Sequence, residues 1–160
     1  MSAKPFPVRI LFVCHGNICR SPMAEFYMKD LVKKKGAEAR FFIESAATSA
    51  EELGNPVYPP ARRMLAAHGI SCAGKTARQI VPSDYERFDL FVGMDRANLR
   101  NMERVFGGDP EGKIRLLLSF AGLMRDVADP WYTGDFEETW RDVEKGCSAL
   151  YEALEQSKKI

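Results

Sequence analysis

The sequence of 160 residues has few of the features that mark membrane, secreted or nucleic-acid-binding proteins. Its formal net charge of +1 leaves no excess of basic residues to attract a nucleic acid or an anionic membrane. No apolar run reaches the roughly 18 residues that suggest a transmembrane helix, and residues 1–7 lack the apolar core of a signal peptide. We therefore expect a cytoplasmic protein with neither nucleic-acid nor membrane partners.

Cysteine is scarce as well. The four cysteines form neither a C-x2-C pair nor the spacing of a zinc site. Without an export signal, they are expected to be free thiols in a reducing compartment. Nothing in the sequence indicates a metal or another cofactor. The four positions are Cys14, Cys19, Cys72 and Cys147.

What is present is the composition of a globular protein, with 46% hydrophobic and 28% charged residues. The length suits one domain over residues 1–160, and no internal repeat or linker divides it. Residues 8–13 form an almost continuous apolar run, which is typical of a strand buried on both faces of a parallel sheet. Shorter strands are expected at residues 41–43, 90–92 and 114–117.

Helical patterns alternate with these strands. Asp95 is an expected N-cap, and Asp135 with Glu138 resembles a capping box before a long apolar stripe. The alternation predicts an α/β fold in which helices flank a four-stranded parallel sheet on both faces, a three-layer sandwich. The helices are expected at residues 21–36, 59–69, 95–107 and 136–154.

The residue types that carry chemistry concentrate in VCHGNICRSP, residues 13–22, where the first strand gives way to a helix. Unpaired N–H groups and the macrodipole at a helix start favour an anion. Cys14 begins the loop, a setting that lowers the pKa of a thiol and makes a thiolate nucleophile. Arg20 closes the loop, and its planar fork suits bidentate contact with phosphate oxygens. A buried structural cysteine is the alternative, which Gly16 and Arg20 argue against.

The stretch VCHGNICRSPMAE resembles the phosphate loop, C-x5-R-S, of the low-molecular-weight protein tyrosine phosphatases. AHGI and ARQI in mid-chain and DPWY at residues 129–132 resemble further motifs of that family in the same order. The resemblance spans about residues 8–154 and implies the phosphotyrosine phosphatase I-like fold. It also implies in-line attack by Cys14 on a phosphotyrosine protein or an aryl phosphate, which gives a cysteinyl-phosphate that water hydrolyses. The phosphate or another oxyanion would be bound by Arg20, Ser21 and the residues between, His15, Gly16, Asn17, Ile18 and Cys19.

The resemblance further implies that Asp129 is the general acid, which protonates the phenolate leaving group and later accepts a proton from water. From residue types alone, an Asp-Pro pair equally begins a turn. Trp131 and Tyr132 would form a flat aromatic wall against the phosphorylated ring, although core packing is the other interpretation. The family often has two tyrosines at these two positions.

Ser21 has two interpretations, an N-cap of the helix and, by resemblance, a hydroxyl that hydrogen-bonds the thiolate. Asn17, Ser45 and His68 match positions that the family joins in a hydrogen-bond network behind the loop. We interpret these three residues as structural support of the loop and not as catalytic residues. Asn17 is expected at positive φ. On residue type alone, His68 is an ordinary residue at a helix C-terminus.

Cys19 either packs inward or captures oxidised Cys14 in a reversible disulfide. Cys147 is expected in the core. Glu51 and Glu52 fall in the segment 45–55, expected to be a loop that forms the rim of the cleft in the family. They are either solvated or discourage acidic flanking sequence on a peptide. Asp95 and Arg78 also match family positions and are interpreted as cap and scaffold.

The same residues suggest three alternative functions. An arsenate reductase on this scaffold would relay oxidation to a downstream cysteine, and residues 80–90 contain none. Phosphoarginine phosphatases of this kind typically have Thr in place of Ile18. An inactive phosphate-binding module would have no use for Cys14, Arg20 and Asp129 together. The sequence therefore predicts a cysteine-dependent protein tyrosine phosphatase.

Overall fold

The computed structural model describes residues 7–157, and within them a four-stranded sheet is ordered β2-β1-β3-β4. All three strand pairs are parallel. The strands are β1 (Val8–Cys14), β2 (Phe41–Ala47), β3 (Leu90–Gly93) and β4 (Ile114–Leu116). Residues 1–6 and 158–160, the two ends of the expected domain, lie outside the described residues, and with them most of the segment expected to lack a signal core.

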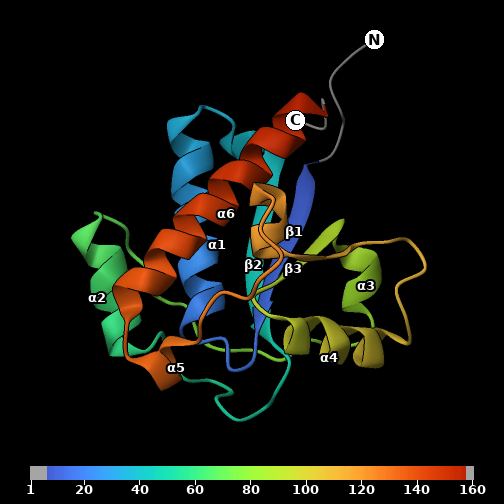
Figure 1. Ribbon diagram of the computed structural model, residues 1–160, viewed down its shortest axis with the longest axis horizontal. Helices are drawn as coiled ribbons and strands as arrows, with labels where there is room; N and C mark the ends of the chain where they lie inside the picture. Colours follow the sequence, from blue (N-terminus) through green and yellow to red (C-terminus); the bar gives the residue numbers. More distant parts are fainter. Residues whose placement is uncertain (1–6, 158–160) are drawn as a thin grey trace.

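Helices cover the sheet on both sides (Figure 1). Helices α1, α2 and α6 lie on one face, and α3 and α4 lie on the other. The predicted three-layer α/β sandwich is therefore confirmed. The α-helices are α1 (Arg20–Lys34), α2 (Pro59–Ala67), α3 (Asp84–Arg87), α4 (Arg96–Phe106), α5 (Pro130–Thr133) and α6 (Phe136–Gln156). Two 3-10 turns cover Glu38–Arg40 and Leu117–Ala121.

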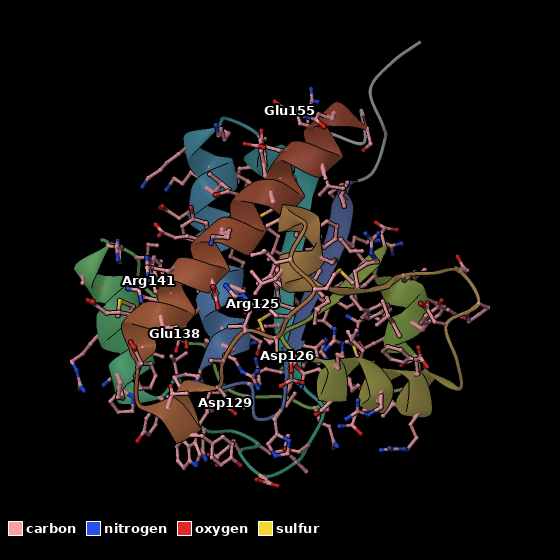
Figure 2. All side chains as sticks on the ribbon, in the orientation of Figure 1. Arg125, Asp126, Asp129, Glu138, Arg141 and Glu155 are labelled. Carbon is pink, nitrogen blue, oxygen red and sulfur yellow. The ribbon has the colours of Figure 1, made fainter. Side chains whose placement is uncertain are left out.

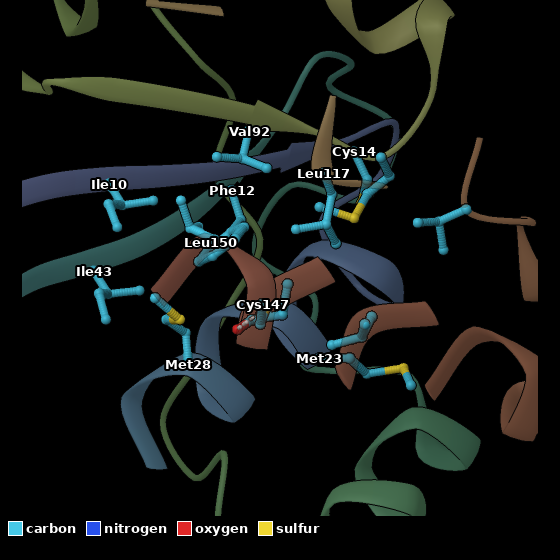
Figure 3. Packing of buried hydrophobic residues seen from close by; sticks show 14 of the residues in the cluster. Ile10, Phe12, Cys14, Met23, Met28, Ile43, Val92, Leu117, Cys147 and Leu150 are labelled. Atoms are coloured by element: carbon cyan, nitrogen blue, oxygen red, sulfur yellow. Dashed lines mark hydrogen bonds between the residues drawn. The ribbon is translucent and has the colours of Figure 1, made fainter. Parts of the chain in front are cut away.

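The apolar run at residues 8–13 follows from the central position of β1 in the sheet. Alternate side chains point to opposite faces of a strand, so both layers of helices need apolar partners from it. Ile10, Phe12 and Cys14 belong to the core beneath α1 and α6 (Figure 3). Leu11 and Val13 belong to the second core, beneath α3 and α4. This alternation places Cys14 at the end of β1 on the face that α1 covers.

Two expected boundaries near the site are wrong. Strand β2 continues to Ala47, so Ser45 lies in a strand rather than in a loop. Ser45 pairs with Phe12, and the small, non-aromatic residues that follow it gave no strand signal. Helix α1 begins at Arg20, with Cys19 at the N-cap position and no side-chain cap. The interpretation of Ser21 as an N-cap is therefore wrong.

The starts of α4 and α6 are as expected, whereas α1 ends at Lys34 and α2 at Ala67, each two residues earlier than expected. Asp95 accepts a hydrogen bond from the Asn98 N–H at 2.8 Å, and the Asn98 side chain completes a capping box. Asp135 accepts one from the Glu138 N–H at 3.0 Å at the start of α6. Cys147 is fully buried on that helix, as predicted. No helix within residues 7–157 is long and apolar enough to cross a membrane.

The fold fixes where a ligand can bind. Strand β1 has β2 on one side and β3 on the other, so the chain leaves β1 at the point where strand order reverses. Ligands of parallel α/β sheets bind at the carboxyl ends of strands at such a point. The segment from Cys14 to the start of α1 occupies this position (Figure 1).

Candidate active site

Residues 14–20 are named here the phosphate loop, and Asn17 of this loop and Ser21 after it form hydrogen bonds with one sulfur atom. Cys14 Sγ accepts hydrogen bonds from the Asn17 N–H at 3.3 Å and from the Ser21 N–H at 3.4 Å. The Ser21 hydroxyl lies 3.0 Å from the same sulfur. The second interpretation of Ser21, a hydroxyl hydrogen-bonded to Cys14, is therefore confirmed. Two N–H donors, and a hydroxyl that is able to donate, suit a sulfur that carries negative charge.

Asn17 holds the loop in this shape. Its φ is +61°, as predicted, and its side chain is buried. The amide donates to Ser21 Oγ at 2.8 Å and to Ser45 Oγ at 2.9 Å. Its carbonyl accepts from the Arg78 N–H at 3.2 Å, which gives Arg78 the predicted scaffold role. A left-handed residue with every side-chain bond satisfied turns the loop N–H groups inward at a fixed angle.

The network continues behind Ser45. The Ser45 hydroxyl donates to Glu25 Oε1 at 2.6 Å. Glu25 is buried on α1 and is paired with Lys29 Nζ at 2.6 Å and Lys75 Nζ at 3.4 Å. Lys75 also donates to the Ser45 carbonyl at 2.8 Å, and burial lowers its pKa against the attraction of Glu25. The expected network therefore includes Asn17 and Ser45 and ends on a buried ion pair.

His68 is not part of that network, so its predicted support role is wrong. It is exposed at the C-terminal end of α2, where its ring stacks on Trp140 with centroids 4.4 Å apart. Its other interpretation, an ordinary helix C-terminal residue, is the one that the structure supports. Lys75 lies behind Ser45 instead. The available signal was a lysine shortly before ARQI and a lone glutamate, Glu25, on the apolar start of α1.

Arg20 is buried beside the loop and held by carboxylates. Its Nη1 donates to Asp95 Oδ2 at 2.8 Å and to the Val127 carbonyl at 2.9 Å. Its Nη2 lies 3.4 Å from Asp129 Oδ2. Burial opposes the charge, but Cys14, Asp95 and Asp129 together raise the Arg20 pKa. Asp95 therefore orients Arg20 in addition to capping α4, a role that the sequence interpretation missed.

Asp129 reaches the site from a position 109 residues further along the chain than Arg20. It caps the single turn α5, where its Oδ1 accepts the Trp131 N–H at 3.0 Å. The other oxygen faces Arg20, and the carboxylate is partly exposed. Figure 2 shows Asp129 just before α5, at the same end of the molecule as the phosphate loop. The expected turn is confirmed, the carboxylate lies beside Arg20, and the role of general acid stays a prediction.

A pocket of about 340 Å³ opens over the phosphate loop. Trp131 and Tyr132 are exposed on its wall, so the alternative of core packing is wrong for both. Tyr58 backs Trp131 with ring centroids 5.0 Å apart, a support that the sequence did not indicate. The lining residues are Cys14, His15, Gly16, Ile18, Cys19, Arg20, Glu51, Glu52, Asp129, Trp131 and Tyr132.

Burial raises the pKa of Cys19, Cys72 and Cys147. Cys19 lines the pocket, but its burial and the nearby Cys14 raise its pKa to about 12. Burial raises the pKa of Cys147 more strongly than that of Cys72. All four cysteines are free. The redox role of Cys19 stays a prediction. Within residues 7–157, no group of three or more His, Cys, Asp or Glu could hold a metal ion.

Comparison with known proteins identifies, over most of the chain, the family that the sequence motifs resemble. Residues 9–160 match the family described as low molecular weight phosphotyrosine protein phosphatase. The Bacillus subtilis low molecular weight protein-tyrosine-phosphatase YfkJ is 37% identical over 155 residues, 96% of this chain and 99% of that protein. The human low molecular weight phosphotyrosine protein phosphatase is 36% identical over 148 residues, 89% and 93% of the two chains.

Solved structures agree with the sequence matches. The crystal structure of YfkJ superposes with a TM-score of 0.93 at 36% identity and covers 97% of this chain and 99% of that one. A Drosophila arginine phosphatase superposes with a TM-score of 0.83 at 28% identity, covering 91% and 96%. The same scaffold therefore occurs in proteins whose names record different phosphorylated residues.

Proposed function

This chain belongs to the low molecular weight phosphotyrosine protein phosphatase family, and from that premise we propose that it hydrolyses phosphotyrosine through a cysteinyl-phosphate on Cys14. The observation that carries the proposal is that Cys14, Arg20 and Asp129 line one pocket. The substrates are phosphorylated proteins, as the family implies. Four free thiols favour a reducing, cytoplasmic compartment.

In the first step, Cys14 Sγ attacks phosphorus while the aryl oxygen leaves on the opposite side. The S–P bond forms as the P–O bond to the ring breaks, and the charge on the three equatorial oxygens has to be stabilised. The N–H groups of the phosphate loop and the Arg20 guanidinium supply that stabilisation. Asp95 and Val127 accept hydrogen bonds from Arg20 Nη1 and hold the guanidinium beside the phosphate loop before the reaction.

Asp129 handles the proton in both steps. In the first step its carboxylic acid protonates the departing phenolate, which makes a poor leaving group competent. In the second step its carboxylate takes a proton from the water that attacks phosphorus, and the S–P bond breaks. The Ser21 hydroxyl, 3.0 Å from Cys14 Sγ, stabilises the departing thiolate. Protons and bonds balance over the two steps without a metal or redox partner.

The aromatic substrate is favoured over phosphoarginine by the wall of the pocket. Trp131 and Tyr132 offer ring faces to a planar phenyl group. Ile18 also lines the pocket with an apolar side chain, where a hydroxyl would suit a polar guanidinium. Arsenate reduction is disfavoured because residues 80–90 hold no cysteine to accept the oxidation.

The test uses purified protein, chelator and mildly acidic buffer. We expect release of phosphate from phosphotyrosine and from p-nitrophenyl phosphate, much slower release from phosphoarginine, and no turnover by Cys14→Ser. The matched control is Cys72→Ser, a buried thiol outside the pocket, which should keep the wild-type rate. Full activity of Cys14→Ser would overturn the mechanism, and faster release from phosphoarginine would overturn the substrate.

A further inference from the structure

The segment Thr48 to Asn55, named here the rim loop, is held by backbone hydrogen bonds at both ends. Its first N–H groups donate to the phosphate loop, Thr48 to the Cys14 carbonyl at 3.0 Å and Ser49 to the His15 carbonyl at 3.1 Å. At the other end, the Asn55 carbonyl accepts from the Ala77 N–H at 2.9 Å. The backbone of the rim loop is therefore anchored on both sides of Glu51 and Glu52.

Glu51 and Glu52 lie between the anchors and line the pocket. A Cβ on Gly16 would lie 3.3 Å from Glu52 Cγ, so the stem of Glu52 packs against the backbone of the phosphate loop. These carboxylates are not a site of their own. They form part of the wall of the pocket that holds the nucleophile.

Neither carboxylate has a permanently charged partner in the pocket. Glu51 Oε2 accepts from His15 Nε2 at 3.1 Å, a bond that a neutral imidazole can donate. Glu52 Oε1 accepts from the uncharged Asn55 amide at 2.8 Å. By contrast, Arg20 on the floor is already matched by Asp95 and Asp129. The pocket therefore has an anion-binding floor and a negatively charged wall.

A substrate that suits both parts carries a phosphate and, beside it, a positive charge. Resting on the proposed function, we propose that Glu51 and Glu52 are specificity-determining residues that select phosphotyrosine flanked by lysine or arginine. A cationic neighbour on the peptide meets the carboxylates, whereas an acidic neighbour is repelled. The selected substrate class is a polypeptide with a basic sequence around its phosphotyrosine.

The experiment compares three phosphotyrosine peptides that differ only in flanking residues, which are lysine, glutamine or glutamate. For the wild-type protein we expect kcat/KM to fall in that order, by about ten-fold from lysine to glutamate, the scale of two partly exposed charge contacts. Raising the NaCl concentration should shrink the ratio, because salt screens exposed charges.

The decisive variant is Glu51→Gln with Glu52→Gln. Glutamine keeps an oxygen that accepts from His15 or Asn55 and removes the charge, so the rim loop keeps its bonds. The lysine-to-glutamate ratio should approach one in this double variant. The matched control is Glu155→Gln, an exposed glutamate at the far end of α6 from Asp129 (Figure 2), which should keep the wild-type ratio.

The outcomes separate the two proposals. If the wild-type protein hydrolyses none of the peptides, the proposed function fails. If it hydrolyses all three with equal kcat/KM, or if the double variant keeps the wild-type ratio, the function stands and the role of Glu51 and Glu52 is refuted.

Discussion

Cys14 and Arg20 are each 3% exposed, whereas Trp131 and Tyr132, on the wall of the same pocket, are 55% and 85% exposed. The floor is held by a buried network that reaches Glu25, so its geometry belongs to the protein core. The two aromatic residues of the wall are exposed, and the ring of Tyr58 lies behind Trp131. We propose that the difference separates two tasks: the buried floor carries out the reaction, and the exposed wall selects the substrate.

Asp129 stands between the two regions, and its removal should have the largest effect. Asp129→Ala should lower kcat/KM, which reports the first step, by about 10²–10⁴-fold for phenyl phosphate, because the phenolate then leaves without a proton. The loss should be much smaller for p-nitrophenyl phosphate, whose leaving group needs no acid. Steady-state kinetics on both substrates checks this.

The control for that comparison is Asp126→Ala, an exposed aspartate outside the pocket that Figure 2 also labels. It should leave the ratio of the two rates unchanged. An equal loss with both substrates in Asp129→Ala would remove this residue from the role of general acid.

Asn17 tests the floor. Asn17→Gly keeps the positive φ but deprives Ser21 and Ser45 of a donor, so the free energy of unfolding should fall by about 1–3 kcal/mol. Asn17→Ala should lose about 1 kcal/mol more, because alanine resists the left-handed region. Urea unfolding measures both. Equal stability of the two variants would show that the backbone angle is not a constraint.

Trp131 tests the wall, and the expected effect is smaller. Trp131→Ala should lower kcat/KM for a phosphotyrosine peptide by about two- to ten-fold, the scale of an aromatic contact, mainly through KM. Trp131→Phe should recover most of it. Phe42→Ala, an exposed aromatic on β2 outside the pocket, is the control. A loss confined to kcat would place Trp131 with the floor instead.

The smallest effect is expected for Cys19, and it should appear only when Cys14 is oxidised. Because its pKa is raised to about 12, the fraction of Cys19 thiolate at neutral pH is small. That fraction, and with it capture of peroxide-oxidised Cys14, should rise about ten-fold per pH unit below the pKa. Mass spectrometry of the disulfide over time at two pH values measures this. A rate independent of pH would exclude attack by Cys19.

The sequence could predict those features that depend on residues close together in the chain. The run at β1 and the stripe on α6 are local patterns, so the sheet and the covering helices were predictable. Cys14 and Arg20 lie six residues apart in one motif. This short separation alone indicates that the two side chains lie close together in the structure. Contacts over long separations gave weaker signals.

Three contacts show why the rest of the site could not be predicted from the sequence. Asp95 shows only its cap in the sequence, because the Arg20 that it orients is 75 residues away. Lys75 and Glu25 become partners only once β2 brings Ser45 between them. His68 matches a family position in sequence, but in the structure it lies at the end of α2 and its ring stacks on Trp140. Burial and pairing were decided by tertiary structure in each case.

The most direct measurement of the whole account is to trap the covalent intermediate. Asp129→Ala should be mixed with p-nitrophenyl phosphate, quenched in acid within the first turnover, digested and analysed by mass spectrometry. The account predicts one phosphoryl group on the peptide that contains Cys14, and none in the Cys14→Ser protein. Release of nitrophenol without a phosphorylated peptide at any quench time, or phosphate on another residue, would contradict it.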